Sequence, residues 1–214
     1  MGVFQECDSL KSVNIPDGVS IISDWLFQEC ESLENIYLPD SIISIGEFAF
    51  SGCISLTNIN IPNNVTRIGY NAFSVCSLTS ITIPDSVTSI GSNAFGSCGS
   101  LESIVIDKNN TVYDSRNNCN AIIETSTNKL IGGCKNTLIP NSVKSIGNGA
   151  FSECSFKSII IPSSVTSIEY MAFYGCFSLE TIYYTGSIYQ WHEIQGLSDC
   201  YLYAKSIVYN YVPE

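Results

Sequence analysis

Ten cysteines are the residues of this 214-residue chain that most readily suggest chemistry, because thiolates bind zinc, form disulfides and act as nucleophiles. A zinc site needs several Cys or His ligands at short, regular spacing. The chain has no Cys-x-x-Cys pair and only one histidine. The sequence therefore predicts neither a metal site nor a cofactor.

His192 is the second candidate, because it precedes Glu193 and the two side chains could act as an acid–base pair. Trp191 and Ile194 are three residues apart, however, which favours a short helix whose apolar side covers the end of a core. His192 and Glu193 would then point toward solvent. We expect no catalysis here and, since the sequence shows no phosphate-binding loop or nucleophile elbow, no enzyme.

Aspartates form the third candidate, because Asp17, Asp40 and Asp85 each follow a proline and a column of carboxylates could hold calcium. Asn63 and Ser163 occupy the same position in other segments and interrupt that column. Asp, Asn and Ser all form hydrogen bonds with their own backbone in turns. We therefore interpret the position as a turn residue rather than an ion ligand.

A tandem repeat explains why these residue types recur. Pro16, Pro39, Pro62 and Pro84 are 23, 23 and 22 residues apart, and phenylalanine recurs in the same register with a cysteine three residues after it. The cysteines at this repeat position are Cys7, Cys30, Cys53, Cys76, Cys98, Cys154 and Cys176. A period in the twenties predicts a solenoid, in which each unit buries its apolar side against its neighbours.

Within one unit, the segment LTSITIP alternates apolar and polar residues and ends at a proline, which is typical of a half-buried strand. Leu78, Ile81 and Ile83 would point inward. The following DSVTSIGSNAF predicts a turn, a short second extended or 3₁₀ segment and a return across the back. Stacked coils would align the first strands into a parallel sheet at about 4.8 Å per coil and pile Phe95 and its equivalents into an aromatic stack.

The patterns Leu-x-x-Ile-x-Ile-Pro, Val-x-x-Ile-Gly and Ala-Phe-x-x-Cys resemble the leucine-rich repeats of the BspA-like (treponemal-type) surface protein family. The resemblance covers nearly the whole chain. It implies a β-rich right-handed leucine-rich repeat solenoid with a parallel sheet along one face and short strand or 3₁₀ segments on the others. It also implies a secreted or cell-surface protein of bacteria or parasitic protists, for which adhesion is the usual proposal.

We expect one domain over residues 1–214, with repeats at 1–106, an irregular inserted hairpin coil at 107–137, repeats at 138–184 and a C-terminal cap at 185–214. The segment VFQECDSLKSVNIPD aligns without a gap on LFQECESLENIYLPD, so residue 3 already lies inside a repeat. We therefore expect a fragment of a longer protein whose signal or anchor lies elsewhere. It should be a monomer, with self-association at the open N-terminal edge as an alternative.

The seven repeated cysteines should be buried free thiols, because stacked side chains about 4.8 Å apart are parallel, whereas a disulfide needs converging side chains at roughly 3.5–4.5 Å. Cys119 and Cys134 differ, because they flank NAIIETSTNKLIGG, which reads as a hairpin around Ser126 and Thr127. Cross-strand partners there would place the two cysteines opposite each other. Two buried thiols are the favoured interpretation, and a disulfide is the alternative.

Composition excludes some partners. The formal charge of −11 and the isoelectric point near 4.4 argue against binding nucleic acid or an anionic membrane, since both need clustered Lys and Arg. No apolar run approaches the ~18 residues of a membrane span. We expect no membrane insertion by this chain.

Function should therefore lie in outward positions of the first strand, whose identity the repeat does not dictate. The candidate ligand-binding residues on this face are Asn14, Tyr37, Asn60, Thr82, Val105, Ile160 and Tyr183. Outward residues that vary from repeat to repeat on a constant solenoid are typical of a recognition surface. They favour a non-enzymatic module that binds host or bacterial extracellular proteins or glycans at the cell surface. Two alternatives stay open: exposed polar residues only keep the array soluble, or the stack is a structural spacer that presents another domain of a longer parent protein.

Overall fold

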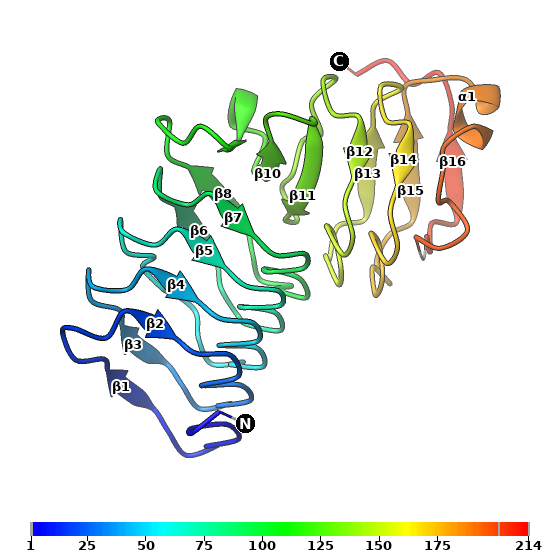
Figure 1. Cartoon of the computed structure of the whole chain (residues 1–214). Helices are drawn as coiled ribbons and strands as arrows, with labels where there is room; N and C mark the ends of the chain where they lie inside the picture. The colour runs from blue at the N-terminus through cyan, green and yellow to red at the C-terminus, as the bar shows by residue number, and fades with distance from the viewer. Residues whose placement is uncertain (1, 201, 214) are drawn as a thin grey trace.

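Each repeat forms one coil of a β-solenoid in the computed structural model, which describes residues 2–200 and 202–213. Figure 1 shows the coils stacked side by side along a bent axis, from the N-terminal end in blue to the C-terminal cap in red. The chain is thus a solenoid of mostly parallel strands with little helix, as the repeat predicts.

The first strands of the coils make one face of the solenoid, which we call the strand face. They pair in parallel, β1 with β3, β6 with β8, β13 with β15 and β15 with β16. Their bounds are β1 Ser12–Asn14, β3 Asn35–Tyr37, β6 Ser80–Ile83, β8 Ser103–Ile106, β13 Ser158–Ile161, β15 Thr181–Tyr184 and β16 Ser206–Val208.

The expectation of a parallel strand in every coil is wrong for the third coil. Residues 54–62 form no strand, although they lie between β3 and β6. Thr57 accepts a backbone hydrogen bond from the amide of Thr79, but among the described residues the backbone of Asn58, Ile59 and Asn60 makes none. The parallel sheet is therefore interrupted at this coil, and we call the unpaired backbone of residues 58–60 the open seam.

The second strands are two residues long and form a separate row. β2, β4, β5 and β7 pair in parallel in the N-terminal coils, and β12 pairs with β14 in the C-terminal coils. Their bounds are β2 Ile21–Ile22, β4 Ser44–Ile45, β5 Arg67–Ile68, β7 Ser89–Ile90, β12 Ser145–Ile146 and β14 Ser167–Ile168. A glycine follows β4, β5, β7 and β12, where the neighbouring backbone comes very close.

Phenylalanine rings form a continuous stack through the N-terminal coils, as the sequence predicts. From Phe4 to Phe95, successive ring centroids are 5.2–5.5 Å apart and the planes are within 14° of parallel. Phe151 and Phe173 repeat the arrangement at 5.3 Å in the C-terminal coils. The repeated phenylalanines therefore serve packing between coils.

The repeated cysteines are free thiols, and their role in packing includes a hydrogen bond that the sequence does not reveal. Cys53 donates to the carbonyl oxygen of Phe27 at 3.1 Å, and Cys76 donates to that of Phe50 at 3.1 Å. Cys30, Cys98 and Cys176 make the equivalent bond. Burial is the main cause that raises the pKa of the Cys53 thiol to about 12. These thiols are thus protonated donors rather than reactive nucleophiles.

The inserted segment forms a small antiparallel sheet between the two sets of coils. It contains β9 Tyr113–Asp114, a 3₁₀ turn at Arg116–Asn118, β10 Ala121–Glu124 and β11 Lys129–Gly133. β10 pairs antiparallel with both β9 and β11, and β11 then pairs in parallel with β12. The segment NAIIETSTNKLIGG is therefore a hairpin, as expected.

Cys119 and Cys134 do not lie directly opposite each other in this hairpin. Glu124 faces Lys129 as the sequence predicts, but a bulge between Ile122 and Ile123 shifts the register by one residue toward the cysteines. Both cysteines are buried free thiols, and Cys134 donates to the carbonyl oxygen of Asn120 at 3.5 Å. Two buried thiols therefore remain the favoured interpretation of this pair.

The hairpin divides the core into two clusters. Ile122 packs with the N-terminal cluster, whereas Ala121 and Ile123 pack with the C-terminal one, because side chains alternate along β10. On the opposite side of the solenoid the adjacent turns meet directly, and the amide of Ser97 donates to the carbonyl oxygen of Ser152 at 3.0 Å. The insertion therefore adds a layer on one side only, which suits the bend in Figure 1.

The last coil is covered by a short helix, α1 Ile188–His192, and by β16. Ser187 forms a capping box with Gln190, which fixes the start of the helix. Trp191 is buried against Tyr184, with ring centroids 5.1 Å apart, and Ile194 is buried too. His192 and Glu193 are exposed, as the spacing of their apolar neighbours predicts.

Left-handed backbone at one turn position yields a stability prediction. Val75 has a φ of 59° and is 44% exposed, whereas glycine occupies the equivalent positions 52 and 175. Left-handed backbone is strained for a β-branched residue, while glycine adopts it freely. We expect Val75→Gly to raise the free energy of unfolding by about 0.5–1 kcal/mol, measured by urea denaturation. A loss of stability would show that Val75 is not strained.

Candidate functional site

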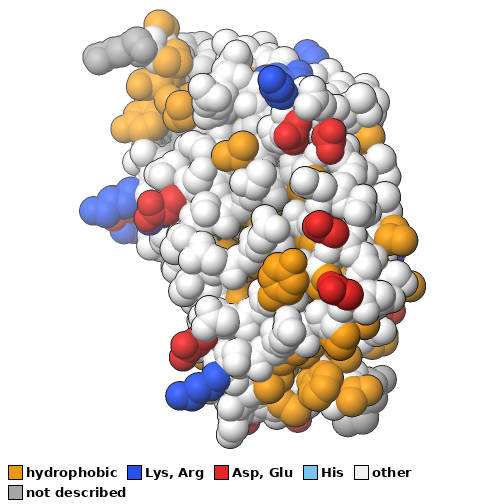
Figure 2. Space-filling model, turned by 90° about the vertical axis from the view of Figure 1, so that its left-hand side faces the viewer, with side chains coloured by type: hydrophobic (Ala, Val, Ile, Leu, Met, Phe, Trp, Pro, Cys, Tyr) orange, Lys and Arg blue, Asp and Glu red, His pale blue; other side chains and the backbone are white. Residues whose placement is uncertain are grey.

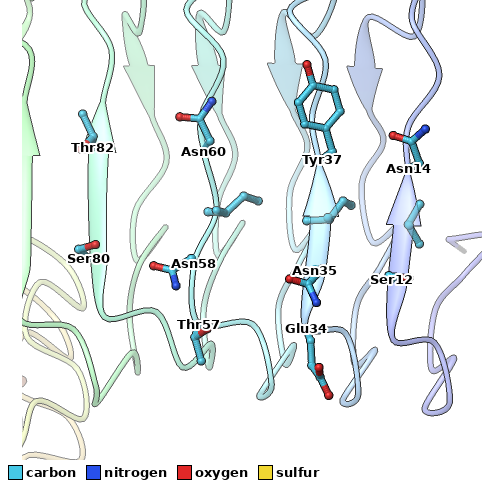
Figure 3. Close-up of a pocket in the computed structure, with 13 residues that line it drawn as sticks. Ser12, Asn14, Glu34, Asn35, Tyr37, Thr57, Asn58, Asn60, Ser80 and Thr82 are labelled. Carbon is cyan, nitrogen blue, oxygen red and sulfur yellow. The ribbon is translucent and has the colours of Figure 1, made fainter.

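An open groove lies on the strand face and spans the first four coils. It has a volume of about 630 Å³ and lies over β1, β3, the strandless third coil and β6. Figure 3 shows two rows of polar side chains along it, with Ser12, Asn35, Asn58 and Ser80 in one row and Asn14, Tyr37, Asn60 and Thr82 in the other. We call this feature the strand-face groove.

Strand geometry explains the two rows. Side chains at positions two apart in a strand point to the same side, so Asn35 and Tyr37 project outward while Ile36 lies between them. Parallel pairing in register places Asn14 beside Tyr37. The half-buried Val13, Ile36 and Ile59 line the groove as well, whereas Ile81 is 2% exposed. Apolar surface is thus accessible beside the open seam.

The groove is nearly neutral and its amides are unsatisfied by the protein. Glu34 is the one charged side chain among the described residues that line it. Within the described chain, no side-chain hydrogen bond is made by Asn14, Asn35, Asn58 or Asn60. Each amide offers two donor hydrogens and an acceptor oxygen. The groove can therefore bind a polar ligand without first breaking bonds within the protein.

Four of the seven predicted binding residues come together in this groove, namely Asn14, Tyr37, Asn60 and Thr82. All four are exposed, and Tyr37 is 62% exposed. Sequence reasoning omitted Glu34 and Thr57, which precede the strand position and reach the same groove. Both residues directly precede a predicted strand, and this position in the repeat could have indicated that they reach the same face.

The other three predicted residues are not among those that line the groove. Val105 is 49% exposed on β8, where it is the register partner of Thr82 at the edge of the groove. Ile160 lines a smaller groove of about 370 Å³ with Leu138, beyond the inserted hairpin. Tyr183 is partly covered by Tyr211, with ring centroids 4.6 Å apart. The hairpin and the cap thus break the single continuous surface that the repeat pattern suggests.

Acidic residues dominate the charge of one flank of the molecule. Figure 2 shows a face with several red carboxylates, few blue cations and an apolar patch near its lower end. Among the described residues, no three His, Cys, Asp or Glu side chains gather as metal ligands would. The described chain also contains no helix with both the length and the apolar character of a membrane span.

Comparison with known proteins identifies relatives of this fold. Six copies of the family model "BspA type Leucine rich repeat region" match residues 1–122 and 121–195. No curated protein matches the chain significantly.

Solved structures of other leucine-rich repeat proteins share this architecture. A leucine-rich repeat protein from Bacteroides ovatus is 28% identical with a TM-score of 0.59, over 98% of this chain and 57% of that one. A leucine rich cell surface protein from Faecalibacterium prausnitzii is 25% identical with a TM-score of 0.62, over 98% and 76%. A leucine-rich repeat protein from Eubacterium ventriosum, 22% identical with a TM-score of 0.62 over 83% and 60%, shares the fold. The chain spans less than two thirds of the Bacteroides and Eubacterium proteins.

Proposed function

Because the chain belongs to the BspA-type leucine-rich repeat family, we propose that it is a non-enzymatic binding module of a cell-surface protein, which attaches to host or bacterial extracellular ligands through the strand-face groove. The observation that supports this proposal is the gathering of unpartnered amides around the exposed Tyr37 in one groove. Tyrosine is among the residues enriched at binding hot spots, because it offers a large contact area at a low entropy cost.

Surface display is supported by likeness to a protein described as a leucine rich cell surface protein, with which the chain shares 25% identity. The negative charge of the chain suits a neutral or basic ligand better than an acidic one. Basic extracellular proteins and neutral glycans both meet that condition.

A structural spacer is the second candidate function. The observation that favours it is the Phe stack, which runs without a break from Phe4 to Phe95 and holds successive coils in one orientation. A spacer needs this rigidity but no exposed aromatic side chain in a groove. Binding experiments on groove variants therefore distinguish the two functions.

We expect Tyr37→Ala and Asn60→Ala each to weaken binding to an immobilised ligand by about 1–2 kcal/mol or more. The ligand would be found by screening the chain against extracellular matrix proteins and glycans by surface plasmon resonance. The thermal midpoint should change little, because both side chains are exposed.

Tyr189→Ala is the matched control, because Tyr189 is 81% exposed on α1, outside the groove. It should leave the affinity unchanged. If both groove variants bind like the parent chain while changes in the inserted hairpin abolish binding, the groove proposal is wrong. If no ligand is found at all, the spacer function is favoured.

A further inference from the structure

We propose that the ligand of the strand-face groove is a neutral oligosaccharide, with one pyranose ring stacked on Tyr37 and hydroxyl groups bound by the flanking asparagines. This inference rests on the proposed function and names the ligand class of the same groove. It follows from the shape, charge and hydrogen-bonding capacity of the groove.

Tyr37 supplies the stacking surface. The side chain is 62% exposed, and Figure 3 shows the face of its ring turned out of the groove between Asn14 and Asn60. It makes no ring contact with another aromatic side chain among the described residues, unlike Tyr183, which packs on Tyr211. The C–H face of a pyranose ring is apolar and flat, and it packs well on such an exposed aromatic face.

The asparagines supply the polar contacts. Asn14 and Asn60 lie on either side of Tyr37, and Asn35 and Asn58 form the second row. An amide donates and accepts at once, which matches vicinal hydroxyl groups that also donate and accept. None of the four amides is engaged within the described protein. Asn35 and Asn58 lie in adjacent coils, whereas Asn14 and Asn60 lie two coils apart with Tyr37 between them, so hydroxyl groups on both sides of a stacked ring can reach an amide.

The open seam adds further donors and acceptors. The backbone of Asn58, Ile59 and Asn60 makes no hydrogen bond in the described chain, and these residues line the groove. Ligand hydroxyl groups can satisfy backbone amides and carbonyls without competing with a sheet. The half-buried Val13, Ile36 and Ile59 offer apolar surface for the C–H groups of the sugar.

Charge and anchor pockets argue for a neutral sugar over a protein. Glu34 is the one charged group among the described lining residues, so an anionic glycan or an acidic peptide finds no partner of opposite sign, and a strongly basic peptide finds a single carboxylate. Protein interfaces rely on buried aromatic or arginine anchors in deep pockets. Small polar side chains make up most of this open groove, which is a better match for a hydroxyl-rich ligand.

Isothermal titration with neutral tetrasaccharides of glucose, galactose, mannose and N-acetylglucosamine tests the proposal on the whole chain. We expect at least one to bind with millimolar affinity or better, and a heparin-derived tetrasaccharide not to bind. Tyr37→Ala should weaken binding about tenfold or more, whereas Tyr37→Phe, which keeps the ring, should retain affinity within about threefold. Asn60→Ala should weaken binding about fivefold or more, and Tyr189→Ala should not change it.

Failure of this inference is distinguishable from failure of the proposed function. Suppose that no neutral tetrasaccharide binds, that an extracellular protein does bind, and that Tyr37→Ala lowers the affinity for this protein. The groove is then a binding site, and the glycan inference is overturned. If a sugar binds but Tyr37→Ala leaves its affinity unchanged, the sugar occupies another surface and both statements about the groove are overturned. Equal folding of the variants is checked by circular dichroism.

Discussion

Gly69→Ala is expected to lower the free energy of unfolding by about 3 kcal/mol, although it adds a single methyl group. A Cβ at Gly69 would lie 2.5 Å from the carbonyl carbon of Gly46 and 2.6 Å from the amide nitrogen of Glu47. Both atoms belong to the backbone of the preceding coil, so neither can rotate away. The coils would have to move apart, which weakens the packing of Phe50 on Phe73 as well.

Gly99→Ala is the matched control for this substitution. The nearest atom to a Cβ at Gly99 is the carbonyl oxygen of Glu153 at 3.6 Å, an ordinary contact. The control should be neutral or slightly stabilising, because alanine reduces the entropy of the unfolded chain. Urea denaturation of the two variants measures the difference. Equal stability of Gly69→Ala and the parent chain would show that adjacent coils are less closely packed at this glycine.

Alkaline pH is expected to destabilise the protein steeply. The pKa of Cys53, Cys98 and Cys176 is raised from the ordinary value of 9.0 to about 12, and burial is the largest cause in each case. Between about pH 9 and 12 the unfolded chain has lost these protons while the folded chain keeps them. A raised folded pKa therefore means that stability is complete below pH 9 and falls as the pH rises. Between these pH values, each thiol lowers the free energy of unfolding by about 1.4 kcal/mol per pH unit. The three thiols together lower it by roughly 4 kcal/mol per unit.

Cys53→Ser tests the origin of this pH dependence. A serine hydroxyl can donate to the Phe27 carbonyl oxygen as the thiol does, but it does not ionise in this range. The slope of unfolding free energy against pH, measured by urea denaturation under reducing conditions, should be smaller by about 1.4 kcal/mol per unit in the variant. An identical slope in both proteins would mean that the Cys53 thiol ionises alike in the folded and unfolded chains.

The repeat made the fold predictable because each coil repeats the same local rules. Phe27 to Phe95 stack and Leu78 and Ile83 are buried, as the spacing of apolar residues requires. The missing strand of the third coil was not predictable, because TNINIP alternates like the segments that do form strands. Whether backbone groups of adjacent coils come within bonding distance depends on how the stack bends, which no single repeat encodes.

The candidate site was predictable only as a face of the solenoid. Outward positions such as Tyr37 and Asn60 follow from strand alternation, and the structure places both in one groove. The separation of Ile160 from that groove follows from the three-dimensional position of the hairpin, which reaches into the core through Ile122 on one side and Ile123 on the other. The sequence predicts the hairpin, but it does not reveal that the hairpin divides the core and the strand face into two parts. Likewise, the cover of Tyr211 over Tyr183 depends on the path of the last residues.

The inserted hairpin also determines how tension would pass along the molecule. In the coils before it, pull is shared by parallel strand pairs, the Phe stack and the S–H donors of the cysteines. At the hairpin, the two sets of coils are connected instead by the Ser97–Ser152 backbone hydrogen bond and by the side chains of β10, which pack into the core on both sides. A module that holds a ligand at its N-terminal coils while its other end is tethered would therefore pass the load through this joint, where hydrogen bonds and the core residues of β10 connect the two sets of coils instead of stacked phenylalanine rings.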